Sequence, residues 1–168
     1  MSQRLRFAQW VPVPLPRVFA FFSDPCNLPR IMPRELGAEL VRVDRVSPPG
    51  AAPGSPEAGV GTVIEVSVRL FPPLPFRTPW VARIVEFERL RHFADVQDRG
   101  PFRRWEHRHE FEAREQGGRD GTVVRDVLEY DVGMGLLGEV AERSFVGPRM
   151  ARTFAHRQST LEALLASS

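Results

Sequence analysis

The chain has 168 residues, enough for one domain of common size and too few for two ordinary ones, so we expect a single domain over residues 1–168. Its 23 basic side chains are all arginine, and with 21 acidic side chains the net charge is only +2. Without lysine, the chain can form no lysine Schiff base and no phosphate-binding loop that needs one. The arginines are dispersed among acids rather than gathered in a basic run, which argues against nucleic-acid binding.

The sequence favours a cytoplasmic protein. Its one cysteine, Cys26, excludes an internal disulfide and fits a reducing compartment. Pro12, Pro14 and Pro16 interrupt the N-terminal region, which therefore lacks the apolar stretch of a signal peptide. No stretch approaches the roughly 20 apolar residues of a membrane span, so we expect no integral membrane association. The oligomeric state stays open.

The expected elements, taken in chain order, begin with a weakly alternating strand over residues 4–13. Pro16 is a good first-turn residue for a helix over residues 17–22, which Asp24-Pro25 ends, and a second short turn covers residues 27–32. Runs rich in β-branched or alternating residues then predict six strands, over residues 36–46, 60–71, 80–87, 92–98, 102–113 and 122–132. Between the first two of these, the Pro- and Gly-rich residues 48–59 predict a mobile surface loop.

The C-terminal region predicts one long amphipathic helix. Between residues 136 and 166 the apolar side chains recur at helical spacing, at Leu137, Val140, Ala141, Phe145, Met150, Phe154, Leu161 and Leu165. Gly147-Pro148 should kink or divide this helix. Hairpin-like strand spacing favours an antiparallel sheet. We therefore predict an α+β fold, in which an antiparallel sheet of about seven strands buries one face against the long C-terminal helix and two short helices follow the first strand. If the sheet is strongly curved around that helix, a cavity forms between them.

Polar side chains are concentrated on the expected inward faces of three neighbouring strands. Alternation places Trp105, His107, His109 and Phe111 on one face of their strand, and charged residues on the other. The same rule groups Phe93, Asp95 and Gln97 on one adjacent strand, and Val124, Asp126, Leu128 and Tyr130 on the other. If all three faces point inward, a polar row crosses an otherwise apolar groove; its members are Asp95, Gln97, His107, His109, Asp126 and Tyr130.

Three readings of this polar row remain open. Its members could satisfy one another structurally where the sheet bends, or they could orient a mostly apolar ligand. They could also perform catalysis or hold a metal, since His107-x-His109 places two imidazoles on one face and a nearby carboxylate could be a third ligand. Arg103 could pair with an anionic ligand at the mouth of the groove, or form a surface ion pair.

Several segments resemble the SRPBCC superfamily, also called START-like, helix-grip or Bet v 1-like proteins. PLPRVFAFFSDPCNLPRIMP resembles its opening helix pair, while FADVQDRGPFRRWEHRHEF, GTVVRDVLEY and the terminal MARTFAHRQSTLEALL are similar to a bacterial ligand-binding subgroup without an established function. The resemblance covers residues 3–166 and implies the helix-grip fold with a cavity that usually holds no metal. The superfamily includes lipid carriers, polyketide aromatase/cyclases, quinone-binding proteins, hormone receptors and chaperone co-activators, so the fold leaves the function open.

We expect a protein that binds, and could also transport, a hydrophobic or amphipathic small molecule such as a lipid, quinone or polyketide. The expected ligand-binding residues are Trp80, Asp95, Gln97, Trp105, His107, His109, Phe111, Asp126, Leu128, Tyr130, Met150 and Phe154. Residues 48–59 and the kink at Pro148 would admit the ligand. The alternative is a cyclase/dehydratase-type enzyme in which His107 or His109, with Asp95 or Asp126, transfers protons. A protein-interaction module is a third hypothesis. We expect no cofactor and no metal.

Overall fold

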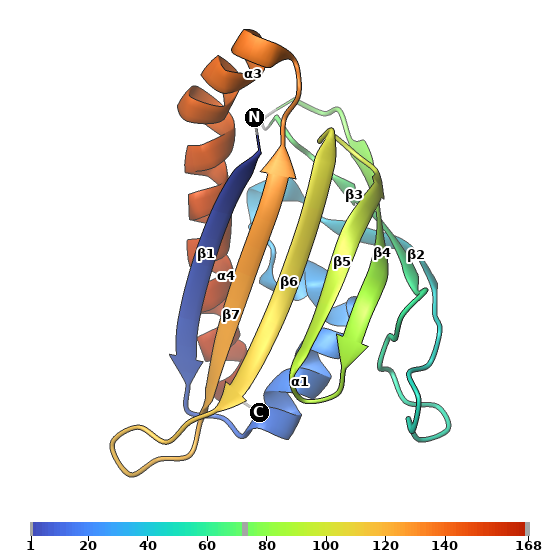
Figure 1. Cartoon of the computed structure of the whole chain (residues 1–168), viewed down its shortest axis with the longest axis vertical. Coiled ribbons are helices and arrows are strands. Elements are labelled where there is room, and N and C mark those ends of the chain that lie inside the picture. Colours follow the sequence, from blue (N-terminus) through green and yellow to red (C-terminus); the bar gives the residue numbers. More distant parts are fainter. Residues whose placement is uncertain (1, 72–73, 167–168) are drawn as a thin grey trace.

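Seven antiparallel strands form one curved sheet in the computed structural model, which describes residues 2–71 and 74–166 (Figure 1). The spatial order is β1-β7-β6-β5-β4-β3-β2, so the first strand closes against the last one. This confirms the predicted fold class and each of the seven predicted strands. Their bounds are β1 Gln3–Val11, β2 Glu39–Asp44, β3 Val63–Val68, β4 Thr78–Glu88, β5 His92–Arg99, β6 Arg104–Ala113 and β7 Thr122–Asp131.

Short helices follow β1 and cover one end of the sheet's concave face. They are α1 Leu15–Ser23, the 3₁₀ turn η1 Pro25–Asn27, α2 Leu28–Ile31 and the 3₁₀ turn η2 Arg34–Leu36. The expectation that Leu36 begins the second strand is wrong. Leu36 ends η2, and Gly37 follows with a φ of 48°, a left-handed conformation that glycine adopts readily. The chain reverses there, and β2 starts only at Glu39.

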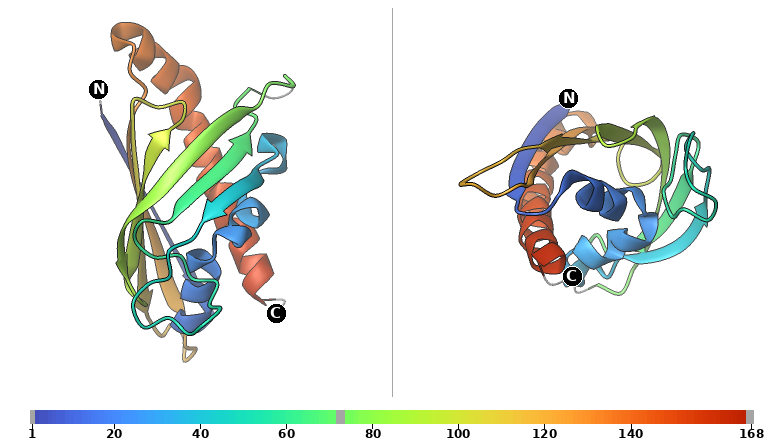
Figure 2. Two further views of the ribbon diagram at one scale, coloured as in Figure 1. Left: turned by 90° about the vertical axis from the view of Figure 1, so that its right-hand side faces the viewer. Right: turned by 90° about the horizontal axis from the view of Figure 1, so that it is seen from below.

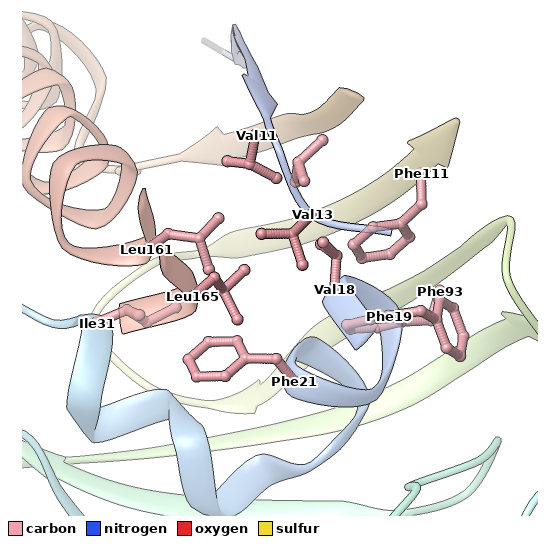
Figure 3. Close-up of a cluster of buried hydrophobic side chains, with 11 residues drawn as sticks. Val11, Val13, Val18, Phe19, Phe21, Ile31, Phe93, Phe111, Leu161 and Leu165 are labelled. Carbon is pink, nitrogen blue, oxygen red and sulfur yellow. The ribbon is translucent and has the colours of Figure 1, made fainter. Parts of the chain in front are cut away.

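The helix α1 lies inside the curve of the sheet (Figure 2). Pro16 starts it without the loss of a hydrogen bond, because the first-turn N–H groups of a helix have no partner within the helix. Its apolar side packs into a buried cluster that also takes side chains from β1, β5, β6 and the C-terminal helix (Figure 3). Phe19 is fully buried there, with its ring centroid 5.3 Å from that of Phe111 and 5.6 Å from that of Phe87.

The C-terminal region forms α3 Gly135–Ala141, the π-helical turn η3 Glu142–Val146 and α4 Gly147–Ala166. The interruption expected at Gly147-Pro148 is present as this wider turn. Proline has no N–H to donate and its ring clashes with the carbonyl four residues earlier, which a π-helical turn accommodates. None of the described helices is long and apolar enough to cross a membrane.

Only the second part of this helical region packs against the sheet. Phe154, Leu161 and Leu165 are buried, as the periodicity predicted. Leu137 and Val140 were expected on the same buried face, but they are 75% and 64% exposed, because α3 extends past the end of the sheet (Figure 2). Helical spacing shows which residues share a face, and it does not show how far the facing sheet reaches.

The Pro- and Gly-rich loop over residues 48–59 is anchored to the fold at its end. The Ala58 N–H donates to the Ser23 carbonyl at 2.8 Å, and the Gly59 N–H donates to the Val46 carbonyl at 2.7 Å. Ala58 is buried, and Glu57 pairs with Arg89 at 2.5 Å. This loop therefore has a fixed end beside α1, where the sequence suggested a freely mobile segment.

Replacement of Phe19 by alanine tests how strongly α1 stabilises the fold. We expect Phe19→Ala to lower the free energy of unfolding by about 3–5 kcal/mol, because it leaves a cavity among the rings of Phe87, Phe93 and Phe111. Urea unfolding measures this difference. Phe76→Ala is the control, since Phe76 is 74% exposed and should change the stability little. Equal effects of the two substitutions would contradict this account of the core.

Candidate functional site

A cavity of about 180 Å³ lies between the concave face of the sheet, α4 and the short helices after β1. Its wall is mostly apolar. The α1–α2 region contributes Phe21, Phe22, Leu28, Ile31 and Met32; β3 and β4 contribute Ile64, Val66, Val68, Trp80, Ala82 and Ile84; and α4 contributes Met150 and Phe154. Strand alternation explains the sheet's share of this wall, because every second side chain of a strand faces the same side.

Seven of the twelve expected ligand-binding residues lie on the cavity wall: Trp80, Asp95, Trp105, His107, His109, Met150 and Phe154. The other five face inward, as alternation predicted, but they contact protein instead of the cavity. The Gln97 amide donates to the Phe102 carbonyl at 2.7 Å, and the Tyr130 hydroxyl donates to Glu142 Oε1 at 2.6 Å. Phe111 and Leu128 are buried in the two hydrophobic clusters, and Asp126 lies behind the histidines.

Asp126 connects the two histidines of the wall. It stands opposite His109 in the β6–β7 register, and its Oδ1 accepts a hydrogen bond from His107 Nε2 at 3.0 Å. His109 Nδ1 is 2.8 Å from the same oxygen, but it does not point at that oxygen in hydrogen-bond geometry. The two imidazole centroids are 4.0 Å apart. All three side chains are buried, so this group is enclosed by protein on the side away from the cavity.

The protonation states of this pair follow from burial and contact. Burial lowers the pKa of His107 to about 3, the neighbouring His109 adds to this effect, and the hydrogen bond to Asp126 opposes it without reversing it. Burial by itself would raise the pKa of Asp126, but its contacts with His107 and His109 outweigh burial and hold that pKa well below its usual range. At neutral pH the structure therefore holds a neutral His107 against an ionised Asp126.

Asp95 is a carboxyl group on the cavity wall itself. It stands opposite His107 in the β5–β6 register, and it is half-buried because one side faces the cavity. Burial raises its pKa to about 6, although His109, Arg157 and a hydrogen bond from the Trp105 side chain act in the opposite direction. Asp95 therefore changes charge close to neutral pH, unlike Asp126 and His107.

Asp95, His107 and His109 form the described cluster that comes nearest to a metal site, since each offers one ligand atom and these atoms lie within 4.8 Å of one another. One observation disfavours a cation there: the positive charge of Arg157 acts on both Asp95 and His107. The absence of a metal and of a cofactor stays a prediction.

The expected ligand-binding set left out the wall residues of β3, together with Ala82 and Ile84 of β4, and two further groups. The first is the α1–α2 region, whose position over the concave face has no periodic signal in the sequence. The second is a polar group on α4, formed by Arg149, Thr153 and Arg157, which alternates with Met150 and Phe154 along the wall. A spacing of four residues placed this group on one face of the helix and could have revealed it. Arg103, considered as a residue at the cavity mouth, instead pairs with Asp131 at 2.5 Å and is largely exposed.

Several solved structures share this fold. The crystal structure of TTHA0849 from Thermus thermophilus matches with a TM-score of 0.68 and 21% identity over 99% of this chain and 100% of that one. Ara h 8.0201 matches with a TM-score of 0.63 and 13% identity over the whole of both chains. Norcoclaurine synthase from Thalictrum flavum matches with a TM-score of 0.61 and 15% identity over 99% of this chain and 88% of that one. That structure was solved in complex with dopamine and hydroxybenzaldehyde.

At these identities the structural likeness shows the fold alone. No curated protein matches the sequence significantly. A family model described as polyketide cyclase / dehydrase and lipid transport matches residues 11–158, which is most of the chain and includes the β-strands that carry Asp95, His107 and His109. The protein therefore belongs to the polyketide cyclase/dehydrase and lipid transport family, within the SRPBCC superfamily.

Proposed function

We propose that the protein binds a compact, mainly apolar small molecule in the cavity between the sheet and α4. The observation that carries this proposal is the composition of the cavity wall: apolar side chains on most sides, with Asp95, His107 and His109 gathered on one strand pair. Ligand sites are commonly apolar with a few convergent polar groups that orient the bound molecule. In this proposal Trp80, Trp105, Met150 and Phe154 contact the apolar body, while Asp95 and the two histidines contact a polar end.

The volume of the cavity limits the size of the ligand. A cavity of roughly 150 Å³ in another protein binds benzene, whereas drug-sized sites occupy about 300–1,000 Å³. The 180 Å³ found here suits a molecule of one or two rings. Dopamine and hydroxybenzaldehyde, held by the norcoclaurine synthase structure, are of this size. A lipid, a long-chain quinone or a polyketide would require the wall to open, so transport of such molecules depends on movement of the protein.

Of the two movable parts expected from sequence, the kink at Pro148 is the one we retain as the route of entry. No residue of the 48–59 loop lies on the described cavity wall, and that loop is tied to α1. Pro148 stands beside Arg149 and Met150, which do line the cavity, and directly after the π-helical turn η3. We place the movable part of the wall at this junction, because a π-helical turn leaves the helix ladder irregular there.

The five inward residues that do not reach the cavity act through the residues that do. Asp126 holds His107 by a hydrogen bond and stands 2.8 Å from His109, so it positions both imidazoles. Gln97 ties the end of β5 to Phe102, whose ring stacks on Trp105 at 5.0 Å. Phe111 fills the cluster on one side of the cavity, and Leu128 and Tyr130 fill the cluster on the other. These residues give the wall its shape and are proposed as positioning residues.

A second candidate function is proton-transfer catalysis, favoured by one observation. Asp95 reaches the cavity and its pKa of about 6 suits a group that gains and loses a proton near neutral pH. Asp126 does not reach the cavity, and the lowered pKa of His107 makes that imidazole a weak base. Of the four candidate catalytic residues, Asp95 is therefore the one we retain as the group that transfers the proton, with His109 beside it.

Filling the cavity tests the binding function. We expect Ala82→Phe to weaken binding of the neutral, two-ring fluorescent probe 1-naphthylamine at least tenfold, because the new ring occupies the space beside Ile64 and Trp80. Fluorescence titration measures the affinity. Val85→Phe adds the same ring on the exposed side of β4 and should leave the affinity unchanged. If the wild-type protein takes up no one- or two-ring apolar probe, neutral or anionic, the binding proposal is wrong.

The titration of Asp95 predicts a pH-dependent change in stability. Its folded-state pKa of about 6 lies above the ordinary value of 3.8, so the folded state holds this proton more tightly and stability is lost as the pH rises through that window. Asp95→Asn removes this pH-dependent loss of stability, because the asparagine side chain does not titrate in this range. At pH 8 the variant should be more stable than the wild type by on the order of 1–3 kcal/mol, and at pH 4 the difference should nearly vanish. Urea unfolding at both pH values measures it, and a difference independent of pH would refute the assignment.

Proton transfer itself can be detected without knowledge of the natural substrate. The probe is 2-tetralone, a two-ring ketone whose C–H next to the carbonyl exchanges with D₂O, followed by NMR. If Asp95 is a general base, the wild-type protein accelerates exchange at least tenfold over buffer and Asp95→Asn returns it to the buffer rate. Asp98 lies on the exposed end of the same strand, so the Asp98→Asn variant should accelerate exchange of the probe as much as the wild type does. Exchange at the buffer rate in the wild-type protein rejects catalysis and leaves the binding function.

A further inference from the structure

Two arginines lie on the wall of an apolar cavity. Arg149 and Arg157 are separated by eight residues of α4, with Thr153 midway, and all three side chains line the cavity. Residues spaced by four lie above one another on one face of a helix. The three side chains therefore form a polar stripe along α4, which we call the α4 stripe, opposite the strands that carry Asp95, His107 and His109.

The arginines of the α4 stripe differ from those on the outer face of the sheet in their partners. On the sheet, Arg83 pairs with Asp98 at 2.8 Å and Arg125 pairs with Glu112 at 2.6 Å, as alternating charges predict. For Arg149 and Arg157, no carboxylate among the described residues lies within 4.0 Å. Their guanidinium carbons instead lie over aromatic rings, 5.4 Å from the Phe145 centroid and 5.0 Å from the Phe154 centroid.

Burial makes this arrangement costly unless an anion at ion-pair distance completes it, since the carboxylates of Asp95 and Asp126 act on Arg157 only from beyond 4.0 Å. Both arginines are half-buried, and a charge removed from water is stabilised only when it is paired and hydrogen-bonded. The aromatic rings attract the faces of the guanidinium groups and leave their N–H edges unused. The hydroxyl of Thr153, which is nearly buried between them, adds a further donor. Donors from the two arginines and the threonine therefore line the cavity along a single helix.

We propose that the natural ligand is a carboxylate: a one- or two-ring apolar body whose acid group binds donors of the α4 stripe. The planar fork of a guanidinium matches the two oxygens of a carboxylate. This inference rests on the proposed binding function and adds the chemical class and the orientation of the ligand. The acid end lies against α4, and the rest of the ring system extends toward Trp80 and Trp105.

The experiment compares 2-naphthoate with its neutral methyl ester, which share the same ring system. Isothermal titration calorimetry measures both affinities for the wild-type protein and for Arg149→Gln, Arg157→Gln and Arg152→Gln. Arg152 is the matched control, because it is exposed on the same helix and does not line the described cavity. We expect the wild type to bind the acid at least tenfold more tightly than the ester. Arg149→Gln and Arg157→Gln should each weaken the affinity for the acid at least fivefold and change the affinity for the ester little. Arg152→Gln should have the same two affinities as the wild type.

The possible outcomes separate this inference from the proposed function. Equal affinity of the wild type for acid and ester overturns the carboxylate assignment, and this comparison needs no variant to fold. An equal loss for both compounds in the arginine variants also overturns it, because the arginines would then act only on the shape of the wall. Binding of 1-naphthylamine by the wild type, without a preference for the acid over the ester, retains the cavity function. Failure of all three compounds to bind overturns the cavity function together with the inference.

Discussion

The structure depends on how α4 packs against a sheet whose concave face is larger than the helix. Contact is made at two separate places. Toward its C-terminus, Leu161 and Leu165 join α1 and β1 in one buried cluster, while in the middle Phe154 joins Leu128 and Tyr130 in another and stacks on Phe7 at 4.4 Å. The cavity lies where these two clusters meet, and each contributes side chains to its wall. Apolar burial at both places stabilises the fold and leaves the space between them for a ligand.

The polar groups of the site are compatible with this apolar interior because most of them bind one another. Asp126 accepts from His107 and stands close to His109, and the protein encloses all three. A buried carboxylate with such partners is far less costly than an unpaired one. Asp95 and the arginines of the α4 stripe differ, because they face the cavity with fewer partners in the protein. The groups that remain incompletely paired are thus those that a ligand can reach.

Particular elements show how far sequence reasoning extends. Alternation along β6 correctly turned Trp105, His107, His109 and Phe111 inward, and it turned their charged neighbours outward. The same alternation could not separate His107, which reaches the cavity, from Phe111, which packs against α1 instead. That difference depends on where the short helices after β1 settle on the sheet. Likewise, helical spacing found the buried side chains of α4 but also included Leu137 and Val140, which lie beyond the end of the sheet.

Resemblance to known proteins identified the family of the fold, and the sequence by itself determined the order and type of the elements and the inward face of each central strand. These follow from local regularities, since the periods of strands and helices are set by the backbone within a few residues. Only the tertiary structure decided which inward side chains line the cavity, how large that cavity is, and that Arg149 and Arg157 face it without a carboxylate partner among the described residues. Those properties depend on contacts between elements that are distant in the chain, such as β5 with α4, and no local pattern encodes such contacts.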